Sequence, residues 1–379
     1  MKVLNVVGAR PNFIKVGPIH RALEATGVCE SLVVHTGQHY DAKMSDIFFR
    51  QLELPEPNYY LGVGGGSHAQ QTAGVMVAFE EVVEQEAPDL VLVVGDVNST
   101  LAATLVATKL HIPVAHVEAG LRSGDRRMPE ELNRLCTDAV ADLLFVTEQS
   151  GLDNLKAEGV PDGRVHFVGN VMIDSLVRFR EKATEIDMLG PLGLEPGSYV
   201  LMTMHRPSNV DRAETLQELA EMAGQLADIQ PVVFPVHPRT RKNLQAHGYW
   251  EDLQGISGLR LLSPIGYLEF LHLMERAAVV VTDSGGIQEE TTYLRVPCLT
   301  LRENTERPIT VTMGSNELME LDAVAVADRV TAIQSEGNSG EVPPLWDGRA
   351  AERIASVLIN KYHGANESHR VGNKTPGLV

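Results

Sequence analysis

Short apolar runs without polar alternation recur along the chain, and each run ends in a polar or glycine-bearing loop. The first run, Val3–Val7, precedes a Gly-Ala-Arg-Pro turn at 8–11 and a helical pattern over 12–25. Runs of this kind are typical of strands that are covered on both faces, as in a parallel sheet. Because a helical segment follows each run, we expect βαβ units. The further strands expected in this series are Leu32–His35, Leu90–Val94, Val114–Val117, Leu143–Val146 and His166–Val168.

A second series of the same kind follows a stretch rich in Pro and Gly at 191–198 and opens with a strand at Tyr199–Met204. We therefore expect an α/β fold of two Rossmann-like domains, 1–170 and 171–365, with parallel sheets facing a central cleft. A final helix over about 348–362 is expected to pack back on the first domain, and 366–379 to form a disordered tail. The further strands expected here are Val232–Val236, Leu259–Leu262, Val279–Thr282 and Cys298–Leu301.

Length and charge narrow the class of protein. The 379 residues, 44% of them apolar, are long for one core and suit two domains. The 50 acidic and 32 basic residues give a net charge of −18. Sequence-independent nucleic-acid binding needs a basic face, so the charge argues against a nucleic-acid partner. It leaves room for a small anionic ligand, because a few Arg and Lys dominate the potential of one site.

The cysteines and the N-terminus indicate a cytoplasmic protein. Cys29, Cys136 and Cys298 stand far apart in apolar stretches without a CxxC motif, so we expect buried free thiols in a reducing compartment. The apolar run before Gly8 is too short for a signal peptide. No apolar run approaches the ~20 residues of a membrane span, and we expect no membrane partner.

Polar residues follow the predicted strands closely, at the edge where parallel sheets bind their ligands. Arg10 and Lys15 at the first strand-to-helix turn suit a phosphate, although one surface cation and one helix cation would give the same pattern. The turn lacks GxGxxG, so a dinucleotide fingerprint is absent. The residues that stand directly after strands are Arg10, Asp96, Glu118, His205, His237 and Ser284.

Three carboxylates stand out in the first half. Asp96 follows a strand and is also a candidate helix N-cap. Glu118 precedes Ala-Gly and is less easily explained by capping. Glu130 and Glu131 open a helix, where acids favour the helix dipole, and that role alone would explain one of the two. Carboxylates converging from separate loops would let one act as base while a neighbour acts as acid.

In the second half the most informative segment is 282–290, where a strand ends, two glycines open a turn and a helix starts. Backbone N–H groups and Ser284 would hold a diphosphate there, and Glu290 one turn into the helix would reach a ribose diol. Arg307 would add a cation. A lone histidine at a strand end, such as His237, is more often a hydrogen-bonded structural residue. No His, Cys or Asp cluster has zinc spacing, so we expect no metal.

At these residues the chain resembles the non-hydrolysing UDP-N-acetylglucosamine 2-epimerases, from residue 1 to about residue 360. The resemblance implies two domains like those of GT-B glycosyltransferases, with UDP held mainly by the second. Eight ordered blocks carry it: GARPNFIK (8–15), TGQH (36–39), GDVNSTLAA (95–103), HVEAGLRSGDRRMPEELNR (116–134), HRPSN (205–209), PVH (235–237), TDSGGIQEE (282–290) and RENTERP (302–308).

Carried over residue by residue, the family pattern makes Asp96, Glu118 and Glu130 the catalytic carboxylates and His205 the active-site histidine. It places Arg10 and Lys15 on the phosphate side of the cleft. Gln38 and His39 match a regulatory site for a second UDP-sugar, but Asp41 and Gln70 stand where those members carry Gln and Arg. The UDP-binding candidates are His237, Ile265, Phe270, Ser284, Gly285, Gly286, Glu290 and Arg307.

The resemblance implies reversible interconversion of UDP-GlcNAc and UDP-ManNAc through loss of UDP, a 2-acetamidoglucal and re-addition, with neither NAD nor a metal, and we expect a homodimer. The loop Asp125–Met128 is shorter than in the best-known members and is shared with relatives that act on UDP-2,3-diacetamido uronic acids, which are an alternative substrate. The same motifs would also suit a hydrolysing 2-epimerase, a GT-B glycosyltransferase or a non-enzymatic nucleotide-sugar binder. The carboxylate trio counts against the binder.

Overall fold

The computed structural model describes the backbone of residues 1–8, 10–37, 53, 56–337 and 340–372; the side chains of residue 10 and of residues 363–372 lie outside the description. The chain divides into two compact units. The first comprises Met1–Ser175 together with Pro344–Val379, and the second comprises Leu176–Pro343. The division falls inside one helix, and the chain returns to the first unit at its end.

The first unit is built on a seven-stranded sheet, in the order β3-β2-β1-β4-β5-β6-β7, and its neighbouring strands run parallel. The strand order reverses at β1, so β1 and β4 form the topological switch point. The strands are β1 Lys2–Val7, β2 Glu30–His35, β3 Tyr59–Tyr60, β4 Leu90–Val94, β5 Val114–Ala119, β6 Leu143–Val146 and β7 Val165–Phe167.

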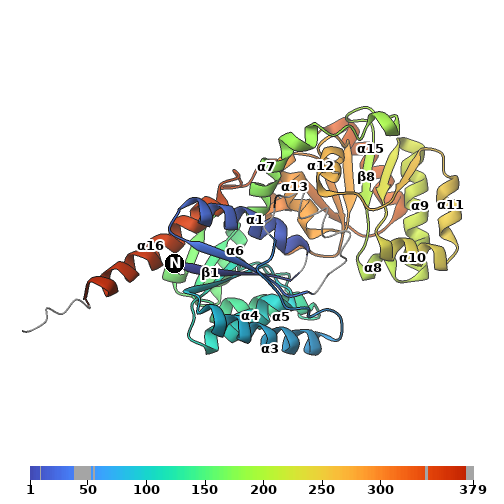
Figure 1. The fold of residues 1–379 in the computed structure, drawn as a ribbon. Helices are drawn as coiled ribbons and strands as arrows, with labels where there is room; N and C mark the ends of the chain where they lie inside the picture. The colour runs from blue at the N-terminus through green and yellow to red at the C-terminus, as the bar shows by residue number, and fades with distance from the viewer. Residues whose placement is uncertain (9, 38–52, 54–55, 338–339, 373–379) are drawn as a thin grey trace, which may run out of the picture. The chain divides into compact units, whose positions relative to one another are not determined.

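Helices cover both faces of this sheet, with α3, α4 and α5 side by side on one face and α1 on the other (Figure 1). Helix α3 starts with a capping box, because Ser67 and Gln70 exchange side-chain and backbone hydrogen bonds. The described helices are α1 Arg10–Ala25, α3 His68–Glu86, α4 Asn98–Lys109, α5 Pro129–Val140, α6 Gln149–Ala157, the 3-10 turn Asp162–Arg164, α7 Val171–Thr184 and α16 Ala350–Gly372.

The core of the first unit follows from the alternation of side chains along its strands. Leu4 and Val6 of β1 point to the same face as Val91 and Val93 of β4 and pack with Phe79 of α3 and residues of α4. The intervening residues Val3, Val7, Leu90 and Leu92 are equally buried. Both faces of the central strands are therefore apolar, and polar side chains are left to the strand ends.

The second unit repeats the plan with a six-stranded parallel sheet in the order β10-β9-β8-β11-β12-β13, which reverses between β8 and β11. A hydrophobic core lies between the sheet and α9, α11 and α15, while α12 and α13 lie on the other side of β8 (Figure 1). The strands are β8 Val200–Thr203, β9 Val232–Pro235, β10 Leu259–Leu262, β11 Val279–Thr282, β12 Cys298–Leu301 and β13 Asn316–Met319. The helices are the 3-10 turn Gly190–Leu192, α8 Pro207–Val210, α9 Ala213–Ile229, α10 Pro238–Ala246, α11 Tyr249–Gly255, α12 Tyr267–Glu275, α13 Gly285–Leu294, α14 Ile309–Thr312 and α15 Ala323–Glu336.

The predicted α/β class and the two parallel sheets are confirmed, with some corrections. Two edge strands, β3 and β13, were missed: β3 has two residues, and the segment of β13 carries Asn and Glu. Cys136 is exposed, against expectation, while Cys29 and Cys298 are buried free thiols. Helix α16 extends to Gly372. Among the described residues, no helix is long and apolar enough to cross a membrane.

Helix α16 belongs to the first unit, where it packs against α1. Asp174 of α7 caps its start: its two carboxylate oxygens accept hydrogen bonds from the backbone N–H groups of Ala350 at 3.1 Å and Ala351 at 2.7 Å. Trp346, which is buried, donates its indole N–H to the carbonyl of Thr147. These contacts fix the returning chain on the first unit.

Candidate active site

The candidate residues of the first unit gather at the carboxyl ends of β1, β4 and β5, beside the switch point. Asp96 follows β4 with one glycine between, and Lys15 lies on α1, the helix that follows β1. Ligands of open α/β sheets bind at this position because the helices on either side of the switch point diverge. The topology thus brings together residues that are far apart in sequence.

Glu118 lies inside β5, at a register shift between Val117 and Ala119, rather than after the strand as expected. Its φ is 71°, a left-handed conformation that costs a non-glycine residue free energy. The side chain is 3% exposed and forms an ion pair with the buried ammonium of Lys15. A β-carbon on Gly95 would lie 3.3 Å from Glu118 Oε2 and 3.5 Å from Lys15 Nζ. The strained backbone thus aims a buried carboxylate at a cation.

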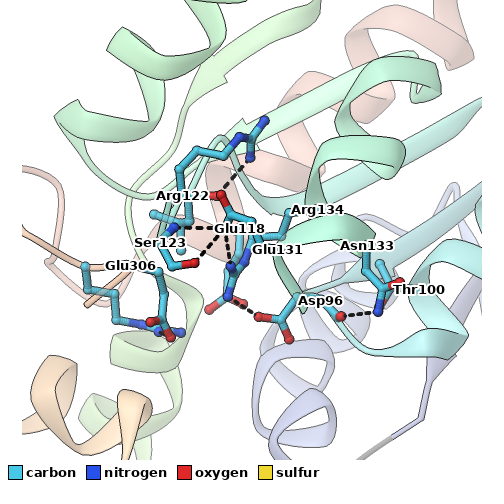
Figure 2. A network of polar contacts seen from close by, with 12 residues as sticks. Asp96, Thr100, Glu118, Arg122, Ser123, Glu131, Asn133, Arg134 and Glu306 are labelled. Atoms are coloured by element: carbon cyan, nitrogen blue, oxygen red, sulfur yellow. Dashed lines mark hydrogen bonds and ion pairs between the residues drawn. The ribbon is translucent and has the colours of Figure 1, made fainter. Parts of the chain in front are cut away.

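Asp96 is held by a second buried cation. The guanidinium of Arg134, a residue 3% exposed, contacts the Asp96 carboxylate through Nη2 and lies 3.2 Å from Glu131 through Nη1. Asn133 donates to the backbone carbonyl of Asp96 at 2.8 Å. Figure 2 shows these side chains in succession along the network. The Asp96 side chain is therefore held in place by residues of α5. Asp96 is not the N-cap residue of α4, because that position is Val97.

The two adjacent glutamates at the start of α5 have different environments. Glu131 is buried and accepts hydrogen bonds from Ser123 N at 2.8 Å, Ser123 Oγ at 3.0 Å and Gly124 N at 3.1 Å (Figure 2). Glu130 is half-buried and makes no hydrogen bond or ion pair with another residue that the structure describes. Glu131 thus anchors the loop before the helix, which leaves the Glu130 carboxylate available to a ligand.

A buried histidine joins β5, the strand that carries Glu118, to the turn that carries Asp96. His116 Nδ1 lies 2.7 Å from Asp138 Oδ1, and its Nε2 lies 2.8 Å from the carbonyl oxygen of Gly95. Asp138 also accepts from the N–H of Gly120 at 2.9 Å and pairs with Arg122 at 2.7 Å. Burial raises the pKa of Asp138, but the charges and hydrogen bonds of His116 and Arg122 outweigh it and hold that pKa below its ordinary value.

In the second unit, β8 and β11 are neighbours in register, with Thr203 opposite Thr282. This register brings His205 to the buried carboxylate of Asp283: His205 Nδ1 lies 2.8 Å from Asp283 Oδ1, and the His205 ring is 40% exposed. Asp283 also accepts from the backbone N–H of Arg206 at 2.8 Å and from Asn209 Nδ2 at 3.3 Å. Burial raises the pKa of Asp283, but the hydrogen bonds from His205 and the backbone outweigh it and lower that pKa.

The N-terminus of α13 directly follows Asp283. Ser284 is its N-cap residue, yet the Ser284 hydroxyl makes no capping hydrogen bond. Gly285 leaves room for a cation here, because a β-carbon on it would come within 2.9 Å of Arg307 Nη1. Uncapped N–H groups, a hydroxyl and nearby guanidinium groups form a suitable environment for a phosphate.

The arginines near α13 differ in how far their charges are already paired within the protein, and Arg307, the expected ligand cation, is paired. Arg307 is 6% exposed and is engaged by two carboxylates, with Nε 2.8 Å from Glu289 and Nη1 in contact with Glu306. Arg302 also pairs with Glu306, at 2.8 Å. The Arg206 guanidinium makes no hydrogen bond or ion pair with a described residue, and burial followed by the charge of Arg302 lowers its pKa. Arg206 is a cation that sequence reasoning missed, and its position directly after His205 was the available signal.

Glu290, the expected ribose ligand, is 4% exposed and accepts a hydrogen bond from Tyr267 Oη at 2.8 Å. Burial and, to a smaller extent, the charge of Glu289 raise its pKa to about 7, against the lowering effect of the hydrogen bond from Tyr267. Tyr267 begins α12, which also carries the half-buried Phe270, and Ile265 stands just before the same helix. Two further UDP-binding candidates, Ile265 and Phe270, thus lie on the same segment as the hydrogen-bond partner of Glu290.

His237 has the hydrogen-bonded structural role that is more common for a lone histidine at a strand end. It is the N-cap residue of α10, and its Nδ1 accepts the N–H of Arg239 at 3.2 Å. Its ring centroid lies 5.6 Å from that of His205, so it also borders the site. The side chain of Arg10 and both regulatory candidates, Gln38 and His39, lie outside the described residues. In the part of the chain that is described, no group of three or more His, Cys, Asp or Glu could hold a metal ion.

Two parallel α/β units with charged residues at their switch points define a protein of the GT-B type, the class of two-domain nucleotide-sugar enzymes. The family model for UDP-N-acetylglucosamine 2-epimerases matches residues 21–359. The chain belongs to the UDP-N-acetylglucosamine 2-epimerase family.

Individual relatives and a solved structure support this assignment to the family. The chain is 40% identical to the UDP-N-acetylglucosamine 2-epimerase of Methanocaldococcus jannaschii, over 94% of this chain and 99% of that protein. It is 41% identical to the UDP-2,3-diacetamido-2,3-dideoxy-D-glucuronate 2-epimerase of Pseudomonas aeruginosa, again over 94% and 99%. The crystal structure of the M. jannaschii enzyme in complex with UDP-GlcNAc and UDP matches with a TM-score of 0.87, over 95% of this chain and 100% of that one.

Proposed function

We propose that the protein is a non-hydrolysing UDP-GlcNAc 2-epimerase that interconverts UDP-GlcNAc and UDP-ManNAc to supply precursors for cell-surface polysaccharides. The observation that carries the proposal is Glu118, a buried carboxylate on a left-handed backbone, paired with Lys15 at the switch point. A protein that only binds a nucleotide sugar has no need to maintain such a strained carboxylate beside two others. Acid–base chemistry at a carbon atom does need it.

The reaction starts with removal of the C2 proton by a carboxylate, as the bond between C1 and the diphosphate oxygen breaks. The electron pair of the C–H bond forms the C1–C2 double bond of a 2-acetamidoglucal, and the electron pair of the C–O bond leaves with UDP. Protonation of C2 on the opposite face and return of UDP to C1 complete the inversion. Asp96, Glu118 and Glu130 are the proposed acid–base groups, because two opposite faces require at least two of them.

The C2 proton is not acidic by itself, so its removal must be coupled to departure of the diphosphate. The mechanism therefore needs positive potential that stabilises the diphosphate as it leaves. The uncapped N-terminus of α13 and the guanidinium of Arg206 supply positive potential at one place in the second unit. His205 borders the same place through its contact with Asp283. We propose that Ser284, Gly285, Gly286 and Arg206 hold the diphosphate there, and that Glu290 with its partner Tyr267 faces the ribose.

A second substrate is supported by one observation. The loop after β5 carries Arg126, which is exposed and makes no hydrogen bond or ion pair with a described residue, next to an Asp125–Arg127 pair. An available cation there suits the C6 carboxylate of a diacetamido uronic acid, the substrate class in the name of the P. aeruginosa relative. UDP-2,3-diacetamido glucuronate is therefore the second candidate.

A comparison of kcat/KM for UDP-GlcNAc and for the diacetamido uronate distinguishes the two candidate substrates. Proton NMR should show conversion of UDP-GlcNAc to UDP-ManNAc at a kcat/KM at least about tenfold above that for the diacetamido uronate, a preference of roughly 1.4 kcal/mol. Arg126→Ala should leave the conversion of UDP-GlcNAc unchanged. If the uronate is the better substrate and Arg126→Ala lowers its turnover alone, the second candidate replaces the first. If neither sugar is epimerised, both fail.

The remaining expectations belong to the same proposal. The mechanism is redox-neutral and its charges are met by side chains and N–H groups, so we propose that it needs neither NAD nor a metal ion. The buried free thiols Cys29 and Cys298 suit a reducing cytoplasm, where we place the protein. We also propose a homodimer, which light scattering at micromolar concentration should report as twice the 41.3 kDa of the chain.

A further inference from the structure

His205 and Asp283 follow different strands, β8 and β11, and meet where the strand order of the second sheet reverses. The ring nitrogen Nδ1 of His205 faces the carboxylate oxygen Oδ1 of Asp283 at 2.8 Å. Asp283 is 0% exposed, while the His205 ring is 40% exposed. One partner is thus fixed in the protein interior and the other presents its ring to a ligand.

The two oxygens of Asp283 have separate tasks. Oδ2 accepts hydrogen bonds from Arg206 N at 2.8 Å, His205 N at 3.0 Å and Asn209 Nδ2 at 3.3 Å, and these bonds fold the segment that follows β8. Oδ1 serves the His205 ring and, at 3.1 Å, the His205 backbone N–H. The carboxylate therefore builds the loop with one oxygen and orients the imidazole with the other.

A carboxylate at Nδ1 determines where the ring carries its proton. An ionised carboxylate only accepts hydrogen bonds, so Nδ1 must be the donor, and in the neutral ring Nε2 is then the acceptor. Nε2 is the nitrogen left for a ligand, at the place where α13 begins and beside the ring of His237. In this tautomer the ring can take up a proton at Nε2 and return it, with the positive charge stabilised by Asp283.

We propose that Asp283 is a positioning residue that fixes His205 in the Nδ1–H tautomer and so keeps Nε2 ready to exchange a proton or a hydrogen bond with the departing and returning diphosphate. The inference rests on the proposed function for its kinetic part only. The tautomer is a property of the free protein and is measured without any substrate.

Asp283→Asn tests this positioning role, because it can keep the hydrogen bonds that Oδ2 accepts while it changes the group that faces the His205 ring. With its oxygen in the place of Oδ2, asparagine keeps the hydrogen bonds from Arg206 and Asn209, and its amide then donates to Nδ1. The His205 ring is thereby forced into the Nε2–H tautomer. Asn209→Ala is the matched control, since it removes a hydrogen bond to Oδ2 and leaves Oδ1 and the ring untouched.

The measurement is a long-range 1H–15N correlation spectrum of the full-length protein with labelled histidine, in which His205→Gln identifies the signal. In this spectrum the His205 ring should carry its proton on Nδ1 in the wild type and in Asn209→Ala, and on Nε2 in Asp283→Asn. In kinetics, Asp283→Asn should reduce kcat at least about 100-fold and keep KM within about threefold of the wild type. An Nε2–H ring in the wild type overturns the proposal, even if Asp283→Asn does not fold. Unchanged kcat in a folded Asp283→Asn also overturns it. A wild type without epimerase activity refutes the proposed function instead, and the tautomer still decides the role of Asp283.

Discussion

His116 and Asp138 form a buried pair, 2.7 Å between Nδ1 and Oδ1, that links β5, the strand that carries Glu118, to α5. The other ring nitrogen of His116 lies 2.8 Å from the carbonyl of Gly95, which can only accept a hydrogen bond. Both ring nitrogens of His116 thus face oxygen atoms that accept hydrogen bonds. The His116 ring thus connects the end of β4 with the last turn of α5.

Asp138→Asn should lower the free energy of unfolding by about 3 kcal/mol or more at pH 7, the scale for removing one charge of a buried pair. Because the pKa of Asp138 in the folded protein lies below its unfolded value of 3.8, this stabilisation is present above that value and is lost as pH falls through the folded pKa. Urea unfolding at pH 7 and at pH 3 measures the difference. The exposed Asp162→Asn is the control. Equal stability of Asp138→Asn and wild type at pH 7 would show that the pair contributes nothing.

Glu290→Gln should show the opposite dependence on pH. The folded pKa of Glu290, about 7, is above its unfolded value of 4.5, so the folded protein loses stability relative to the unfolded chain as pH rises from about 4.5 to 7. The glutamine variant has no such group, and it should gain up to about 3 kcal/mol over the wild type between pH 4.5 and pH 7.5. The exposed Glu185→Gln should follow the wild type at both pH values. A difference between Glu290→Gln and wild type that does not change with pH would contradict the buried carboxylate.

The carboxylate trio is tested by variants that keep the size of each side chain. Asp96→Asn, Glu118→Gln and Glu130→Gln should each reduce kcat at least about 100-fold, the usual scale for acid–base groups. The affinity for UDP, measured by calorimetry, should stay within about threefold of the wild type, because its proposed ligands are in the second unit. Near-normal turnover in all three variants would remove the trio from the mechanism.

Arg134→Lys tests whether the geometry of the guanidinium matters as well as its charge. Arg134 reaches Asp96 with one nitrogen and Glu131 with the other, while an ammonium group is a single point of charge. We expect kcat to fall about tenfold or more, since a Lys would leave Asp96 or Glu131 without its partner. Arg126→Lys, an exposed change nearby, is the control. If Arg134→Lys turns over like the wild type, the position of Asp96 does not depend on this bridge.

The fold was largely predictable because both faces of the sheets are apolar. Runs such as Leu90–Val94 and Val279–Thr282 have the bounds that the sequence predicts. The start of α5 was equally readable from Pro129 and the two acids after it. Local sequence carries these features, and the fold class follows from their order.

The missed parts of the site depend on contacts between segments distant in sequence. Arg134 meets Asp96 across 38 positions, and Asp283 meets His205 across 78. No local pattern reports that β8 and β11 are neighbours, so the carboxylate behind His205 was not foreseen. The left-handed backbone of Glu118 was not foreseen either, because the register shift that produces it comes from pairing with β6.

The most direct test of the central claim is proton NMR of UDP-GlcNAc with the wild-type enzyme in D2O. Elimination and re-addition exchange the hydrogen at C2 with solvent, so deuterium should appear at C2 of both UDP-GlcNAc and UDP-ManNAc while little free UDP accumulates. Retention of the original hydrogen at C2 in UDP-ManNAc would contradict the elimination mechanism. Release of UDP in equal amount to the sugar consumed would show a hydrolysing enzyme instead.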